Sequence, residues 1–233
     1  MSWRRQTLDI FNKALNTTGL KLVTLQSLEE LALPRTRERP HFTFAGRSYP
    51  YFSHQYNCGW PAGYATERTV ELALADAWLS TTPMMNVIEV GAVSPYYWPG
   101  RVPRIVDPAD EHMQVSDRLP MDSIDMSGKD VLCISTLEHF GKSDYGLVPD
   151  PVLLRAAVYQ LASQARTLLA TVPFGYNPMA DELFFGDVPL PGFRVGYLVR
   201  DLDRMEWRET NAIDARRPYT DRYAASAIAV IEK

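Results

Sequence analysis

The sequence is poor in cysteine, in long apolar runs and in basic charge, and each shortage excludes a class of protein. Its 233 residues include two cysteines, Cys58 and Cys133, whose spacing fits neither a disulfide framework nor a zinc site. No apolar run approaches the ~20 residues of a membrane-spanning helix, so we expect no membrane partner. The formal net charge of −4 gives no overall attraction to phosphate backbones, so nucleic acid is not an expected partner.

The first residues also lack the apolar core of a signal peptide, because Met1–Arg5 leads into a polar segment. Together with the low cysteine content, this pattern favours a cytoplasmic protein. Hydrophobic residues make up 46% of the chain and charged residues 22%. These values are ordinary for a globular protein, and the length of 233 residues predicts one large domain, or one domain with extensions.

Three short apolar runs each end in polar residues, which is the pattern of buried strands in a parallel sheet. We predict these strands near residues 86–90, 104–107 and 130–135. Further strands are predicted at 168–172, 193–199 and 227–231, and helices from residue 66 and from Asp150–Pro151. Helices interleaved with strands make the predicted fold α/β. Such sheets bind ligands at the carboxyl ends of their strands, which makes the polar residues there candidate site residues.

Residues 1–65 differ from residues 66–233, which contain the predicted strands. Leu8, Phe11 and Leu15 have helical spacing, and a second short helix is expected at 27–33. Residues 41–64 combine eight aromatic side chains with prolines and glycines, which indicates a structured loop and not a regular element. We expect this aromatic segment to cap the site, because rings with polar tips suit sugars and adenosine.

The strand ends offer candidate binding residues, each with an ordinary alternative. Gly91 would let the backbone approach a ligand closely, although a lone glycine at a strand end often only makes a turn. Asp107 could accept hydrogen bonds from both ribose hydroxyls, or act as a turn acid before Pro108. Asp117 could accept a hydrogen bond from an exocyclic amine, or remain a solvated loop acid.

The segment Ser135-Thr136-Leu137-Glu138-His139 is the strongest signal for chemistry, because polar side chains follow a very apolar strand. An imidazole exchanges protons near neutral pH. At the ligand-binding edge of a sheet, His139 is therefore a natural general base, and we favour this role over a structural one.

Taken in order, Glu89-Val90-Gly91, Asp107, Asp117-Arg118-Leu119-Pro120 and the segment from Ile134 to His139 resemble the motif series of class I S-adenosylmethionine-dependent methyltransferases. Segments 51–57, 67–71, 171–178 and 206–209 resemble a bacterial subgroup associated with sugar metabolism. Its relatives include actinobacterial sugar O-methyltransferases of polysaccharide synthesis. The resemblance covers roughly residues 49–231 and departs from the family at the glycine-poor first loop.

The resemblance implies a Rossmann-like class I methyltransferase fold, with a mostly parallel central sheet and helices on both faces. It implies S-adenosylmethionine as cofactor and a sugar or glycan hydroxyl as methyl acceptor. The implied cofactor-binding residues are Glu89 and Gly91 beside the methionine part, Asp107 at the ribose, Asp117 near the adenine, and Ser135 and Tyr64. The implied catalytic residues are Glu138 and His139, and the implied acceptor-binding residues are His54, Tyr56, Asn57 and Tyr176.

Several alternatives stay open at this point. A divalent cation such as Mg²⁺, held by carboxylates such as Asp144, could activate the hydroxyl in place of His139. The acceptor could be another small-molecule hydroxyl or an amine, and a homodimer is left open. A nicotinamide-dependent oxidoreductase is disfavoured by the missing Gly-x-Gly-x-x-Gly pattern. A non-catalytic nucleotide-binding module is disfavoured by the presence of Glu138-His139.

Overall fold

A computed structural model describes residues 40–52, 66–143, 149–188, 190–201, 206–217 and 225–233. All of them belong to the unit that runs from Thr36 to Lys233. The two helices predicted before residue 34 therefore lie outside the described residues, and the predicted segment 1–65 stays a prediction. No helix in the described part of the chain is long and apolar enough to cross a membrane.

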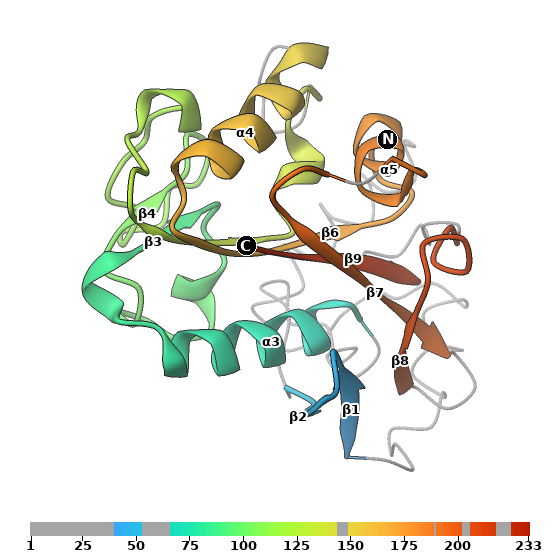
Figure 1. Cartoon of the computed structure of the whole chain (residues 1–233). Coiled ribbons are helices and arrows are strands. Elements are labelled where there is room, and N and C mark those ends of the chain that lie inside the picture. Colours follow the sequence, from blue (N-terminus) through green and yellow to red (C-terminus); the bar gives the residue numbers. More distant parts are fainter. Residues whose placement is uncertain (1–39, 53–65, 144–148, 189, 202–205, 218–224) are drawn as a thin grey trace, which may run out of the picture. The chain divides into compact units, whose positions relative to one another are not determined.

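A seven-stranded sheet runs through the described unit (Figure 1). Its order is β4 (Ile105–Val106), β3 (Val87–Val90), β5 (Asp130–Ile134), β6 (Thr167–Pro173), β9 (Ala227–Glu232), β7 (Arg194–Asp201) and β8 (Glu206–Thr210). The first four strands are parallel, and the other pairings are antiparallel. The predicted α/β class is confirmed, and the sheet is mixed with a parallel part, β4-β3-β5-β6, because β9 lies between β6 and β7 in the opposite direction.

Helices cover both faces of the sheet, as predicted (Figure 1). Helix α3 (Arg68–Thr81) packs on one face, and α4 (Pro151–Gln164) and α5 (Pro178–Phe185) on the other. Alternating side chains of β5 supply both cores: Val131 and Cys133 pack with the α4 side, and Leu132 and Ile134 with the α3 side. This two-sided burial explains why the strand is apolar without a break.

Short 3-10 helices connect several of these elements, at Met84–Asn86, Ser94–Tyr96, Met121–Ser123 and Leu137–His139. The proline-rich linker between β3 and β4 therefore contains only a truncated helix, as its sequence predicts. Helix α4 begins as predicted, because the Asp150 side chain accepts a hydrogen bond from the Val152 N–H at 2.9 Å.

The strand order reverses between β3 and β5. The chain passes from β3 to β4 on one side, and the next strand, β5, pairs with β3 on its other side. Loops that leave such neighbouring strands in opposite directions open a crevice at the carboxyl ends of the strands. The fold therefore places a ligand crevice beside Gly91 and Ser135.

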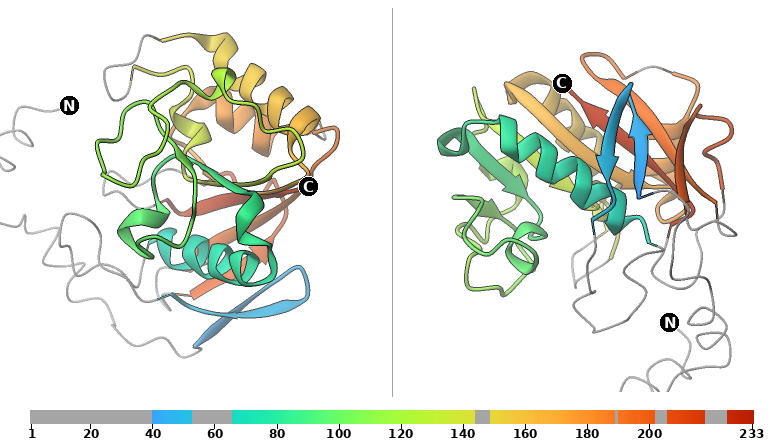
Figure 2. Two further views of the ribbon diagram at one scale, coloured as in Figure 1. Left: turned by 90° about the vertical axis from the view of Figure 1, so that its left-hand side faces the viewer. Right: turned by 90° about the horizontal axis from the view of Figure 1, so that it is seen from below.

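The prediction that residues 41–64 contain no regular element is wrong for its first part. Strands β1 (His41–Phe44) and β2 (Arg47–Pro50) form an antiparallel hairpin. Its two-residue turn, Ala45–Gly46, has positive φ at both positions, which matches the twist of a hairpin. Phe42 and Phe44 alternate into the core, and Figure 2 shows the hairpin beside α3 and the antiparallel end of the sheet. The alternation of apolar and polar residues at 41–44 was the pattern in the sequence that could have predicted this strand.

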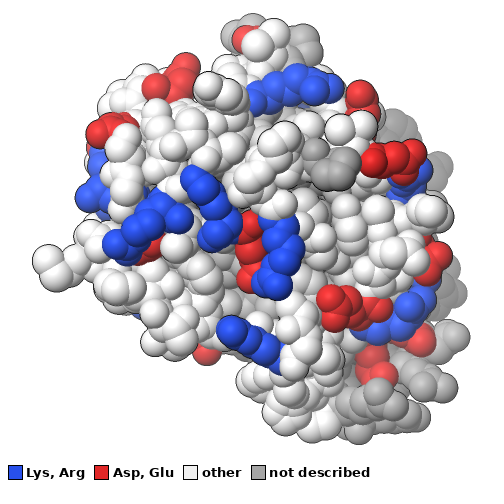
Figure 3. Space-filling view, viewed as in Figure 1, with Lys and Arg blue, Asp and Glu red and all other residues white. Residues whose placement is uncertain are grey.

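Charged side chains on the face seen in Figure 1 are mixed in sign. Figure 3 shows basic and acidic residues interspersed among uncharged ones on this face. The expectation that nucleic acid is not a partner stays a prediction.

Candidate functional site

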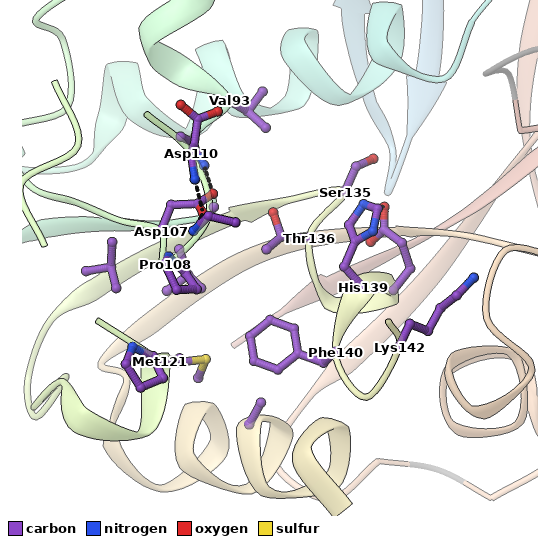
Figure 4. A pocket seen from close by; sticks show the side chains of 18 of the residues that line it. Val93, Asp107, Pro108, Asp110, Met121, Ser135, Thr136, His139, Phe140 and Lys142 are labelled. Atoms are coloured by element: carbon purple, nitrogen blue, oxygen red, sulfur yellow. Dashed lines mark hydrogen bonds and ion pairs between the residues drawn. The ribbon is translucent and has the colours of Figure 1, made fainter. Parts of the chain in front are cut away.

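A pocket of about 900 Å³ opens at the carboxyl ends of β3, β4 and β5 (Figure 4). This volume lies within the ~300–1,000 Å³ typical of small-ligand sites. Six residues predicted from the sequence line it: Gly91, Asp107, Ser135, Glu138, His139 and Tyr176. Glu89 and Asp117 are not among the lining residues. His54, Tyr56, Asn57, Tyr64 and Asp144 lie outside the described residues.

Two features of the structure require glycine at position 91: the backbone conformation there and the close contact with Thr136. Its φ is +86°, a conformation that side chains disfavour. A Cβ at this position would overlap the hydroxyl oxygen of Thr136 and lie 2.7 Å from Thr136 Cγ2. The loops after β3 and β5 are therefore in close contact at the crevice, where Gly91 has no side chain between its backbone and a ligand.

Glu89 stabilises the first loop from inside and does not face the pocket. Its Oε1 accepts hydrogen bonds from the N–H groups of Val93 (3.1 Å) and Ser94 (2.8 Å), and its Oε2 accepts one from the Ser94 hydroxyl. Burial raises the pKa of Glu89 to about 7, although these hydrogen bonds oppose the rise. The alternation of β3 explains the placement, because Ile88 and Val90 pack on the α4 side and Val87 on the α3 side.

Asp107 joins the loops after β3 and β4. Its Oδ2 accepts the Ala92 N–H at 3.0 Å, and its Oδ1 accepts the N–H groups of Ala109 (2.8 Å) and Asp110 (2.9 Å). A carboxylate has about four acceptor positions. The half-buried side chain lines the pocket and so retains capacity for a ligand hydroxyl. Both the turn role and the binding role weighed from the sequence are compatible with this geometry.

Asp117 lies at the outer edge of the sheet, beside β4. Its Oδ2 accepts a hydrogen bond from Arg104 Nε at 2.8 Å, and its backbone forms a parallel bridge with Val106. Met121 and Asp122, a few residues later, line the pocket in its place. A contact between Asp117 and the adenine thus stays a prediction that this side-chain geometry does not favour.

Ser135 is held in a strained conformation by a buried polar group. Its φ is +43°, unusual for a residue with a side chain. Its hydroxyl donates to Glu71 Oε1 at 2.6 Å, and Thr171 Oγ1 donates to the same oxygen at 2.7 Å. Because the single hydroxyl proton is used in this way, Ser135 can offer only its oxygen lone pairs to a ligand.

Glu138 and His139 are neighbours that both line the pocket. His139 Nε2 lies 3.8 Å from Glu138 Oε1. The Glu138 side chain is 3% exposed, and its Oε2 has no hydrogen-bond partner among the described residues. Burial raises the pKa of Glu138 well above its ordinary value. His139 is more accessible, with 22% of its side chain exposed, so it can meet a ligand directly.

Tyr176 and Lys142 complete this side of the pocket. The Tyr176 ring contacts the His139 ring edge-on, with 4.9 Å between centroids. Lys142 Nζ donates to the Tyr176 carbonyl oxygen at 2.8 Å and lies 3.8 Å from the centroid of its ring. Sequence reasoning singled out Tyr176 but not Lys142, whose position three residues after His139 was the available signal.

The loops after β3 and β4 contribute further residues that sequence reasoning missed. Tyr96 donates its hydroxyl proton to the Asp110 carboxylate, 2.9 Å from Oδ2. Partial burial and this hydrogen bond raise the pKa of Tyr96 to about 12. His112 Nδ1 accepts the Gln114 N–H at 3.2 Å, so a neutral ring has its proton on Nε2. Tyr96, Asp110 and His112 all line the pocket.

Acidic side chains dominate the β4 side of the pocket. Among the described residues, the segments 107–112 and 120–122 give the lining Asp107, Asp110, Glu111 and Asp122 but no lysine or arginine. Arg118 donates to the backbone oxygens of Asp110 and Glu111 and does not line the pocket. In the described part of the chain no group of three histidine, cysteine or acidic side chains could hold a metal ion.

No protein-family model, no curated protein and no solved structure matches this chain.

Proposed function

We propose that this chain is an S-adenosylmethionine-dependent O-methyltransferase that acts on a hydroxyl of a sugar or glycan. In this proposal the α/β sheet is a Rossmann-like methyltransferase fold. The observation that carries the proposal is the pocket at the strand reversal, with the Asp107 carboxylate on one side and the Glu138–His139 pair on the other. A binding group and a proton acceptor thus border one cavity.

The residues of the β4 side fit S-adenosylmethionine by their chemistry. Gly91 leaves open backbone at the crevice, and Asp107 retains acceptor capacity for ribose hydroxyls. Four carboxylates border this side and favour a ligand that carries a sulfonium and an ammonium group.

A nicotinamide dinucleotide fits the same side poorly. Its two phosphates would face Asp107, Asp110 and Glu111, and like charges repel. Phosphates are normally held by a glycine-rich turn at a helix N-terminus. The segment after β3 has Gly91 alone and forms a 3-10 helix, Ser94–Tyr96, in place of a long helix. The charge pattern therefore supports the methyl donor over the dinucleotide.

When bound, S-adenosylmethionine supplies a methyl group already activated by its sulfonium. The protein must then orient an acceptor hydroxyl and remove its proton as the new bond forms. His139 borders the cavity and takes this proton on its imidazole. Glu138, 3.8 Å from His139 Nε2, stabilises the resulting imidazolium, because a buried carboxylate gains most from a neighbouring cation.

Transfer of a labelled methyl group from S-adenosylmethionine to a panel of sugars tests this proposal. We expect incorporation that depends on His139 and survives chelation of divalent cations. The matched control is His112→Gln, which changes a second histidine of the same pocket. Absence of incorporation into every sugar, with transfer to an amine or a phenol instead, would contradict the sugar assignment.

A further inference from the structure

The pocket has two chemically different sides. Asp107 and Asp110 lie on one side, and His139 and Lys142 on the other, with Thr136 and Phe140 between them (Figure 4). The sheet order explains the separation, because Asp107 follows β4 and His139 follows β5, and these strands are two strand spacings apart, or roughly 10 Å. A ligand that spans the pocket therefore meets carboxylates at one end and an ammonium group at the other.

The position of Lys142 is fixed by its backbone. Gly141 precedes it with φ of +79°, and a Cβ there would lie 2.6 Å from the Asp150 carbonyl oxygen. The Lys142 N–H donates to the His139 carbonyl oxygen at 3.2 Å. Asn177, which is 1% exposed, donates to the carbonyl oxygens of Glu138 (3.0 Å) and Phe140 (3.2 Å). These hydrogen bonds from Asn177 thus hold the segment that contains His139 and Lys142 against the turn that contains Tyr176.

The ammonium group of Lys142 is oriented but not saturated. Its contacts with the Tyr176 carbonyl and ring leave donor capacity, since an ammonium has three N–H groups. Asp181, on α5, accepts the Gly175 N–H at 2.8 Å and interacts electrostatically with Lys142, but it does not line the pocket. Tyr176 is therefore a positioning residue that presents a cation beside His139.

The described carboxyl groups that line the pocket on this side form no ion pair with Lys142. Glu71 pairs with Arg68, 3.2 Å away. Glu67 and Glu138 line the pocket but are 5% and 2% exposed. Burial raises the pKa of Glu67 to about 7, which reduces its negative charge near neutral pH. Glu138 lies beside His139, with its Oε1 3.8 Å from His139 Nε2.

From this arrangement we propose that the methyl acceptor is an anionic sugar, whose carboxylate or phosphate binds Lys142 while a neighbouring hydroxyl meets His139. This inference rests on the proposed function and narrows its substrate class. A sugar uronate and a sugar phosphate share the required chemistry. A neutral sugar would leave the ammonium group without an anionic partner in the complex, at a cost in affinity.

Ligand-observed NMR titration on the protein saturated with S-adenosylhomocysteine tests the inference. The probes are methyl glucuronoside, glucose 6-phosphate and the neutral methyl glucoside. We expect one of the two anionic probes to bind roughly 10- to 100-fold more tightly than the neutral probe, as for a charged hydrogen bond. Preference for the uronate or for the phosphate identifies the source of the anion.

Variants separate this inference from the proposed function. Lys142→Gln should abolish the anionic preference and leave the affinity for S-adenosylhomocysteine unchanged, and Lys142→Arg should retain part of the preference. Lys129→Gln, outside the pocket lining, is the control. Equal binding of neutral and anionic probes to the parent protein, or a preference that survives Lys142→Gln, would overturn the inference. Failure of S-adenosylhomocysteine to bind at all would instead reject the proposed function.

Discussion

Gly91 at the end of β3 and Thr136 after β5 approach so closely that a Cβ on residue 91 would overlap the Thr136 hydroxyl. We therefore expect Gly91→Ala to lower the free energy of unfolding by about 3 kcal/mol or more, from backbone strain together with the overlap. Gly128→Ala is the matched control, because Gly128 has φ of +70° and nothing within 4 Å of its added Cβ. Urea denaturation of both variants measures the difference. Equal losses would mean that the contact with Thr136 contributes nothing.

Asp107 is expected to contribute to ligand affinity more than any acid outside the pocket. Asp107→Asn keeps the size of the side chain but weakens its hydrogen bonds to a ribose. The affinity for S-adenosylhomocysteine should fall by about 10- to 100-fold. Asp117→Asn is the control, since Asp117 pairs with Arg104 at the edge of the sheet. Calorimetry on folded protein gives both values, and a larger loss in the Asp117 variant would reverse the assignment.

His139→Gln should reduce methyl transfer by about 10²–10⁴-fold and leave the affinity for S-adenosylhomocysteine unchanged. The rate of the parent protein should fall at low pH, because a protonated imidazole cannot accept a proton. Steady-state kinetics across pH measures both effects. A metal-activated mechanism predicts the opposite pattern, in which chelation abolishes turnover and His139→Gln retains most of it.

Glu89 makes stability depend on pH in a defined direction. Folding raises its pKa from 4.5 to about 7, so between these values the folded state retains a proton that the unfolded state releases. The stability from this proton is complete below pH 4.5 and is lost as pH rises through 7. The glutamine side chain of the Glu89→Gln variant does not titrate. Its free energy of unfolding, compared with that of the parent protein at the same pH, should therefore rise by up to ~3 kcal/mol between acid and alkaline pH.

Urea denaturation at several pH values measures this trend, with the exposed Glu182→Gln as control. A stability difference between Glu89→Gln and the parent that stays constant with pH would show that the buried carboxyl does not titrate differently on folding.

The sequence predicted those elements whose patterns are local. Strands β3, β5 and β6 are short apolar runs, and α4 begins at an Asp-Pro cap. Helix α5 was missed although Asn177 and Pro178 begin it in the same way, with the Asn177 side chain accepting the Met179 N–H at 3.0 Å. The eight-residue helix is too short for a clear periodic pattern. The position of β9 is a tertiary property that no local pattern encodes.

Site residues that follow the end of a strand could be predicted from the sequence. Those within a strand were harder to predict, because successive side chains point to opposite faces of the sheet. Asp107, Ser135 and His139 converge because parallel strands end at one edge. Glu89 lies within a strand, so the pleat directs its side chain toward the α3 side and the first loop. Lys142 enters the pocket through the turn at Gly141, a geometry that spacing from a strand does not reveal.

The measurement that tests the central claim most directly is parallel calorimetric titration of the protein with S-adenosylhomocysteine and with NAD⁺. The account predicts stoichiometric binding of S-adenosylhomocysteine that weakens in Asp107→Asn, and no binding of NAD⁺. Binding of NAD⁺ without S-adenosylhomocysteine would contradict the account and make this pocket a dinucleotide site.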